Sequence, residues 1–224
     1  MRWLIISICF YSFISISAQA ADSVFIEELT WVEVRDAIKD GKTTIIFPTG
    51  GTEQNGPHMV LGKHNFIVKH AAGEIARRLG NALVAPVVAY VPEGRVAPPS
   101  SHMRFPGTVS VPEPVFEQTL AAIGESYKAH GFRWVVFLGD HGGYQAALTR
   151  AVAQMNQRWG NGATHALAPS EYYAASTEGY ARWLREQGYR DDEIGTHAAL
   201  ADTSLQLFVA PESVRTEALK AGTG

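Results

Sequence analysis

The chain has 224 residues, of which 46% are hydrophobic and 18% are charged, and its formal net charge is −3. This length and composition predict one globular domain with a sizeable core. The small negative charge argues against a nucleic-acid-binding protein and favours a small-molecule or neutral partner.

Residues 1–20 have the pattern of a secretory signal peptide. Residues 1–2 include a basic side chain, residues 3–16 are mostly apolar, and Ala18 and Ala20 suit a cleavage site. A membrane anchor is the alternative interpretation, but the apolar stretch is short for a span and contains three serines. We therefore predict that residues 21–224 form the mature protein, a single domain that is periplasmic or secreted, with no stable membrane span after cleavage.

Predicted helices and strands alternate along the rest of the chain. Thr30, with Glu33 three residues later, has the pattern of a capping box, which predicts a helix that ends near Gly41. Apolar runs predict strands over residues 43–47, 82–91, 134–138 and 164–168, and helical spacing predicts helices over 65–79, 112–130, 144–159, 171–186 and 198–209. This alternation predicts a three-layer α/β/α sandwich around a mostly parallel sheet.

The loop after the first predicted strand has the composition of a metal site. Residues 48–65 contain Glu53, His58 and His64 around a glycine-rich turn. Oxygen and nitrogen donors of this kind suit zinc or manganese, and loops after the carboxyl ends of strands are where open α/β sheets place their sites. The alternative is a polar turn with a surface acid, because the spacing matches no common short metal signature.

The long loop at residues 92–112 contains His102 and Arg104, and loops of this length are often functional. Two other segments carry polar chemistry besides residues 53–64: the turn at 139–143, with Asp140 and His141, and residues 197–202, with His197 and Asp202. Acids and imidazoles that converge suit a hydrolytic metal centre, because the ion activates water and polarises a carbonyl group. A phosphate-binding turn at 139–143 is the competing interpretation, but no Lys-Ser/Thr pair follows it.

Four motifs, in order, resemble those of the creatininase (creatinine amidohydrolase) family over residues 25–214. The family pattern Pro-x-Gly-x-x-Glu-Gln-His-Gly-Pro-His-Leu-Pro-Leu, followed by Thr-Asp, matches residues 48–61 and then Lys63-His64. Its His-x-x-Phe-Pro-Gly-Thr matches residues 102–108, its Asn-Gly-His-Gly-Gly-Asn matches 139–144, and its His-Ala-Gly-Glu-x-Glu-Thr-Ser matches 197–204. The resemblance implies an α/β/α fold, often assembled into hexamers, and a metal centre that hydrolyses carbon-nitrogen bonds. It also leaves open whether the chain is complete at its C-terminus.

The resemblance assigns site residues position by position. Glu53 and His141 match metal ligands, and Asp202 matches a carboxylate near the metals. The sequence departs from the family at a ligand histidine, which is Asn55 here, and at the carboxylate that bridges two metals, which falls at His64.

A neutral imidazole ordinarily binds one ion. Our hypothesis is therefore a single zinc-like site made by Glu53, His64, His141 and Asp202, with Asp140 as a compensating carboxylate. Zinc is the expected metal and manganese the alternative, with one or two ions per subunit left open.

The remaining candidate residues surround this predicted centre. His197, which matches a family residue near the substrate, and Asp140 are candidates for moving protons. Candidates for substrate binding are Ser101, His102, Arg104 and Gly142, although a structural loop role is the alternative for His102 and Arg104. The predicted function is a metal-dependent amidohydrolase for a small cyclic or linear amide, in a homo-oligomer. The alternative is a catalytically silent protein that binds a small molecule.

Overall fold

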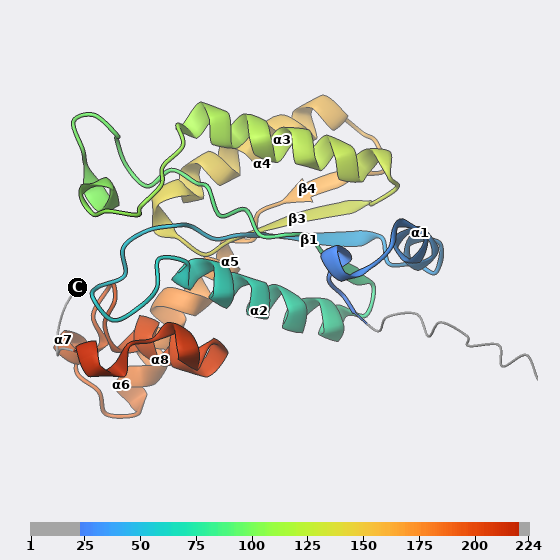
Figure 1. Ribbon diagram of the computed structural model, residues 1–224. Coiled ribbons are helices and arrows are strands. Elements are labelled where there is room, and N and C mark those ends of the chain that lie inside the picture. Colours follow the sequence, from blue (N-terminus) through green and yellow to red (C-terminus); the bar gives the residue numbers. More distant parts are fainter. Residues whose placement is uncertain (1–22, 220–224) are drawn as a thin grey trace, which may run out of the picture.

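The computed structural model describes residues 23–219, which form a parallel sheet of four strands in the order β2-β1-β3-β4 (Figure 1). The strands are β1 (Thr44–Thr49), β2 (Ala82–Val84), β3 (Trp134–Gly139) and β4 (His165–Leu167). The predicted signal peptide, residues 1–20, lies outside the described residues. Within residues 23–219, no helix is long and apolar enough to cross a membrane.

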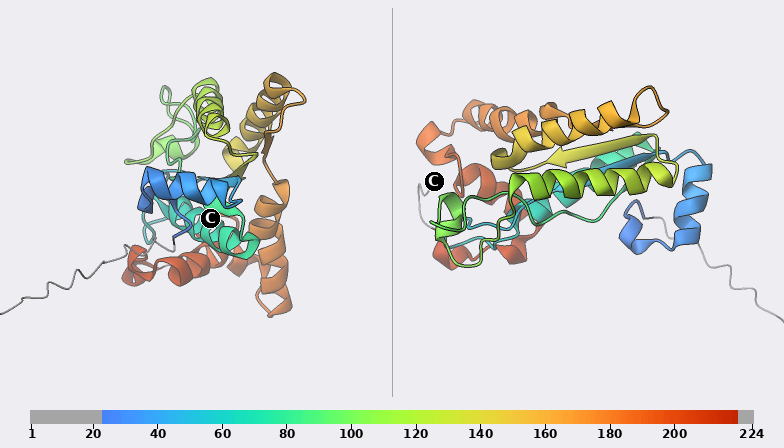
Figure 2. Two further views of the ribbon diagram at one scale, coloured as in Figure 1. Left: turned by 90° about the vertical axis from the view of Figure 1, so that its right-hand side faces the viewer. Right: turned by 90° about the horizontal axis from the view of Figure 1, so that it is seen from above.

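Helices cover both faces of the sheet, which confirms the predicted three-layer α/β/α arrangement. The long helices α3 and α4 lie side by side over one face, and α2 lies on the other face with the C-terminal helices beyond it (Figures 1 and 2). The helices are α1 (Trp31–Lys39), α2 (Lys63–Leu79), α3 (Glu113–Ala129), α4 (Gln145–Trp159), α5 (Ser170–Ala174), α6 (Tyr180–Glu186), α7 (Asp191–Ile194) and α8 (Leu200–Val209).

The side chains of β1 alternate between two apolar cores, as the period of a strand requires. Ile45 and Phe47 face α3 and α4 and pack with Phe137 of β3, whereas Ile46 faces α2 and packs with Val68. All of these side chains are buried. Burial on both faces explains why the strand has a continuous apolar sequence.

Strands β1 and β3 are paired along their whole length, from Thr44 with Trp134 to Thr49 with Gly139. Both strands therefore end at the same level of the sheet. The loops that follow them leave the sheet side by side, and these loops carry Glu53 and His141.

Two elements differ from the sequence-based expectation. The strand predicted over residues 82–91 is regular only to Val84, because Pro86 has no N–H for the ladder; the chain beyond it makes only isolated bridges. The helix predicted over residues 171–186 is divided by a π-helical segment, Ala175–Gly179. There the hydroxyl groups of Ser176 and Thr177 donate to the carbonyl oxygen of Tyr173 and compete with the regular helical ladder.

Candidate active site

The site lies beyond the carboxyl ends of β1 and β3, and one buried tyrosine fixes the two loops to each other. The Tyr144 hydroxyl accepts hydrogen bonds from the backbone N–H groups of Asp140 (3.0 Å) and His141 (3.2 Å). It donates to the carbonyl oxygen of Thr49 (2.5 Å). Because Tyr144 is fully buried, the start of the His141 turn has a fixed position relative to the end of β1.

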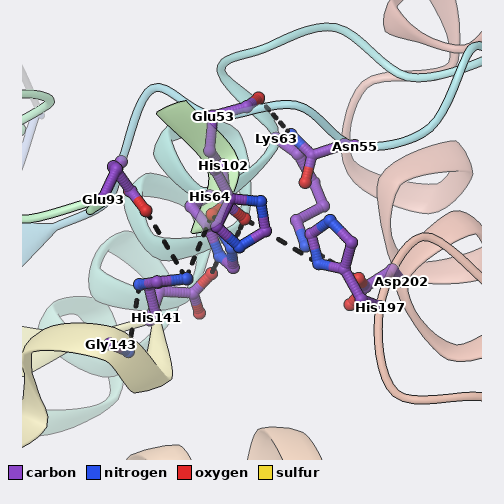
Figure 3. A network of polar contacts seen from close by, with 12 residues as sticks. Glu53, Asn55, Lys63, His64, Glu93, His102, His141, Gly143, His197 and Asp202 are labelled. Carbon is purple, nitrogen blue, oxygen red and sulfur yellow. Dashed lines mark hydrogen bonds and ion pairs between the residues drawn. The ribbon is translucent and has the colours of Figure 1, made fainter. Parts of the chain in front are cut away.

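Two carboxylates and two imidazoles converge in this region: Glu53, Glu93, His102 and His141 each offer one ligand atom, and these four atoms lie within 4.8 Å of one another. Oε2 of Glu53 lies 3.0 Å from Nε2 of His141 and 3.1 Å from Nε2 of His102. Oε2 of Glu93 lies 3.6 Å from Nε2 of His141 (Figure 3). We call these four residues the ligand group.

The carboxylates of the ligand group are buried, since Glu53 is 0% exposed and Glu93 is 2% exposed. Within residues 23–219, Oε2 of Glu53 and both oxygens of Glu93 have no well-aligned hydrogen bond, although two imidazole nitrogens lie 3.0 and 3.1 Å from Oε2 of Glu53. Unpaired buried oxygens of this kind are costly unless a cation or a donor compensates them. Two oxygen and two nitrogen donors fit zinc or manganese, so the ligand group fits a divalent cation.

A glycine permits this close approach of Glu93. A Cβ atom at Gly51 would lie 2.6 Å from Oε1 of Glu93. The glycine-rich turn after β1 therefore makes room for an acid from a different loop.

Burial and mutual repulsion favour a state in which only one of the two acids, Glu53 and Glu93, is ionised. Burial, together with the neighbouring charge of Glu53, raises the pKa of Glu93 to about 10. Burial would also raise the pKa of Glu53, but the neighbouring imidazoles of His141 and His64 outweigh it and hold this pKa below its ordinary value. Glu53 is therefore the ionised acid of the pair and Glu93 the protonated one.

His64 lies beside the ligand group and bridges two carboxylates. Its Nε2 is 2.9 Å from Oε1 of Glu53 and its Nδ1 is 2.7 Å from Oδ2 of Asp140. The Tyr172 hydroxyl donates to the other oxygen of Asp140 (2.6 Å). Burial and the charge of Lys63 would lower the pKa of His64, but Asp140 and Glu53 outweigh them and raise it. The structure thus places His64 and Asp140 in a chain that orients Glu53, outside the ligand group.

Asp202 is held by a buried lysine. Nζ of Lys63 lies 2.7 Å from Oδ2 of Asp202, and the backbone N–H of Ala198 donates to the same oxygen (2.9 Å). Burial would raise the pKa of Asp202, but Lys63 outweighs it and lowers this pKa. Of the four predicted metal ligands, the ligand group therefore contains Glu53 and His141, and His64 and Asp202 lie around it.

His197 lies near the ligand group, and its Nδ1 has no hydrogen bond to any part of the chain that the structure describes. Its Nε2 is 2.9 Å from the backbone carbonyl oxygen of Gln54 and 3.2 Å from the side-chain amide nitrogen of the same residue. We assign the proton to Nε2, because the shorter of the two contacts is to an oxygen that can only accept. Its Nδ1 is 3.9 Å from Oε1 of Glu53, and the His102 ring is 4.9 Å away between centroids. Burial, followed by the charge of Lys63, lowers the pKa of His197. A neutral imidazole with a free Nδ1 suits proton transfer.

The predicted substrate-binding residues have different positions. His102 belongs to the ligand group. Gly142 lines a cavity of about 180 Å³ beside it, where a Cβ atom would lie 2.6 Å from the Tyr173 hydroxyl oxygen. Ser101 and Arg104 are exposed, and within residues 23–219 their side chains form no hydrogen bond or ion pair.

Sequence reasoning missed Glu93 and Lys63. Glu93 is the only acid in the long loop at residues 92–112, and this was the available signal. No comparable signal marks Lys63, because its partner Asp202 is 139 positions away in the chain. At the departure from the family motif, Asn55 is buried and its amide donates to the carbonyl oxygens of Glu53 and Val60.

The fold and the site together define an α/β protein with a candidate metal centre at the carboxyl edge of its sheet. The family described as "Creatininase: Creatinine amidohydrolase" matches residues 27–224, and the chain belongs to this family. The resemblance stated from the four motifs is thereby confirmed.

Related proteins of known name are hydrolases. The chain is 31% identical over 186 residues to the mycofactocin precursor peptide peptidase of Mycolicibacterium smegmatis, an alignment that covers 80% of this chain and 62% of that protein. It is 30% identical over 119 residues to creatinine amidohydrolase of Pseudomonas putida, covering 53% of this chain and 45% of that protein. The chain thus spans less than two thirds of the length of these curated relatives.

Solved structures of creatininase have the same fold. A crystal structure of creatinine amidohydrolase superposes with a TM-score of 0.74 at 25% identity and covers 89% of this chain and 77% of that one. A structure named "Creatininase Mn" superposes with a TM-score of 0.71 at 25% identity and covers 86% of this chain and 75% of that one.

Proposed function

We propose that this protein is a metal-dependent amidohydrolase whose ion is held by Glu53, Glu93, His102 and His141. The observation that carries the proposal is the convergence of two buried carboxylates and two imidazoles, whose ligand atoms lie within 4.8 Å of one another, with both Glu93 oxygens lacking a hydrogen bond among residues 23–219. Zinc is the proposed metal and manganese the alternative, since this donor set suits both and a similar structure is named for manganese.

A divalent ion in the ligand group would lower the pKa of water and polarise a carbonyl group. The chain's own residues supply the rest of the chemistry. His197 has a free Nδ1 near Glu53, so it can take a proton from the attacking water and later give it to the leaving nitrogen. His64 and Asp140 hold Glu53 in one orientation through a continuous hydrogen-bonded chain.

The proposed substrate is a small cyclic or linear amide. The similar proteins act, by their names, on a precursor peptide or on creatinine, and both reactions break a carbon-nitrogen bond. The polar cavity of about 180 Å³ between His141, His197 and Tyr173 supports binding of one amide group beside the ligand group.

One contact favours the alternative function, a silent protein that binds a small molecule. The backbone N–H of Gly143 donates to Nδ1 of His141 (3.1 Å), which leaves the ring proton on Nε2, the atom that faces Glu53. A metal ion would have to replace this proton. If the proton stays, the N–H group of His141 faces the Glu53 carboxylate, and no metal ion binds there.

Metal analysis separates the two functions. The purified protein is expected to contain zinc or manganese, to lose amide hydrolysis after chelation and to regain it when the ion is returned. The matched variants are His141→Ala, which is expected to abolish metal binding, and the helix-end His130→Ala, which is expected to retain it. Metal-free protein with no hydrolysis of peptidyl p-nitroanilides, creatinine or hydantoins would favour the silent binding protein.

We also propose export and assembly into a homo-oligomer, a hexamer by the family resemblance. The signal-like pattern of residues 1–20 supports export. Cell fractionation with N-terminal sequencing tests the first proposal, and light scattering on the purified protein tests the second. A chain retained in the cytoplasm with its first residues intact, or a monomer, would contradict them.

A further inference from the structure

Lys63 is a buried lysine whose only ion-pair partner within residues 23–219 is Asp202. Its side chain is 1% exposed, and lysines are almost never fully buried unless they are paired. Nζ lies 2.7 Å from Oδ2 of Asp202. A lysine ammonium has three donors, and this contact uses one of them.

Lys63 lines the same cavity as the proton-transfer residue. Lys63 and Asp202 line the cavity of about 180 Å³ together with His141, His197 and Tyr173. The position of Lys63 on the first turn of α2 places a fixed positive charge in a wall of this cavity.

We propose that Lys63 is a catalytic residue whose ammonium binds the carbonyl oxygen of the amide substrate and serves as the second cation of the site. The inference rests on the proposed hydrolase function. It implies one metal ion per chain, because the lysine already neutralises Asp202 and would repel a further divalent ion there.

In the proposed reaction, Lys63 stabilises the carbonyl oxygen and His197 transfers the proton. Water attacks the amide carbon, the electron pair of the carbonyl double bond moves to oxygen, and the Lys63 N–H donates to this oxygen as it becomes negative. Nδ1 of His197 holds the proton released by the water. When the carbon-nitrogen bond breaks, this proton passes to the leaving nitrogen, and the products are a carboxylic acid and an amine.

A set of matched variants tests the role of Lys63. Lys63→Met removes the ammonium and keeps the length of the side chain, but it leaves Asp202 buried without a partner. The double variant Lys63→Met with Asp202→Asn removes both charges, so its folding is not disturbed by an unpaired carboxylate. The control is Lys69→Met on the same helix, where the lysine is exposed and pairs with Glu27.

The measurements are zinc content by mass spectrometry, thermal unfolding, and kcat on the peptidyl p-nitroanilide or cyclic amide that the wild-type protein hydrolyses. One zinc per chain is expected in the wild type and in all variants. Lys63→Met is expected to lower both Tm and kcat, the latter by about 100-fold, as for the loss of one oxyanion donor. The double variant is expected to recover Tm while kcat stays about 100-fold low, and Lys69→Met to match the wild type.

Two results would overturn the inference alone. The first is a double variant with the kcat of the wild type, since Lys63 would then only neutralise Asp202. The second is two zinc ions per wild-type chain. A wild-type protein with neither metal nor hydrolysis would instead overturn the proposed function, and the inference with it.

Discussion

The Glu93→Gln variant is expected to be more stable than the wild type without metal and to bind metal more weakly. The Glu93 carboxyl is buried without hydrogen bonds next to the charge of Glu53, and its pKa is raised to about 10. A folded-state pKa above that of the unfolded chain means that the stability from this group is complete below about pH 4.5. It is lost progressively as the pH rises towards about 10.

The size of this effect follows from the two pKa values. A pH of about 7.5 lies about three units above 4.5, the pKa of this carboxyl group in the unfolded chain. Each unit corresponds to about 1.4 kcal/mol. Metal-free wild type is therefore destabilised by at most about 4 kcal/mol, a large share of the 5–15 kcal/mol typical of a folded protein. The neutral amide of glutamine carries no such penalty, and near pH 4.5 the difference should vanish.

With metal bound, the wild type is expected to be more stable than Glu93→Gln, because a neutral amide oxygen is a weaker ligand than a carboxylate. Loss of this ligand is expected to reduce zinc affinity by at least about 100-fold, the upper end for residues that merely support ligands. Urea unfolding in EDTA at about pH 4.5 and 7.5 measures the first effect, and zinc titration against a competing chelator measures the second. The control is Glu186→Gln at the exposed end of α6. Unchanged zinc affinity, or no gain in metal-free stability at about pH 7.5, would refute the reasoning.

Three further variants test the framework of the site. Tyr144→Phe removes the hydroxyl that accepts from the N–H groups of Asp140 and His141, and urea unfolding should show a loss of about 1–3 kcal/mol; a loss below about 0.5 kcal/mol would mean that water replaces the hydroxyl. Phe137→Ala opens a cavity at the centre of the sheet and should cost about 3–5 kcal/mol in the same assay, so a cost below about 1 kcal/mol would contradict the packing. Asp140→Asn removes one carboxylate from His64 and should lower its pKa, as measured by NMR titration; an unchanged pKa would contradict the bridging role.

The sheet could be predicted from the sequence because its central strands are marked by local patterns. Residues 43–47 and 134–138 are apolar runs with β-branched side chains and are buried on at least one face. Strand β2 was predicted too long, since an apolar run does not show which N–H groups find partners after a proline. The division of the helix predicted over residues 171–186 depends on side-chain hydroxyl bonds, which a hydrophobic pattern does not report.

The site could be predicted only in part, for a related reason. Glu53 and His141 lie within four residues of the ends of β1 and β3, so their convergence follows from the parallel pairing of these strands. Glu93 reaches them from a loop beyond β2, and its approach depends on the absence of a side chain at Gly51. The partnership of Lys63 with Asp202 joins the start of α2 to α8, and no spacing rule connects positions so far apart.

Strands β1 and β3 end at the same level of the sheet, and this determines where the sequence can tolerate insertions and deletions. A shift of β3 by one residue along β1 would move His141 by about 3.3 Å and turn the buried side chains of the strand to the opposite face, whereas metal-ligand distances tolerate about 0.2 Å. One residue gained or lost within Trp134–Gly139 would thus remove the ligand group even from a sheet that still assembles. The turn between α4 and β4, residues 160–164, lies at the opposite edge, so extra residues there leave the ligand group in place. We therefore expect insertions and deletions to be tolerated at the amino edge of the sheet and not within the strand that positions His141 at its carboxyl edge.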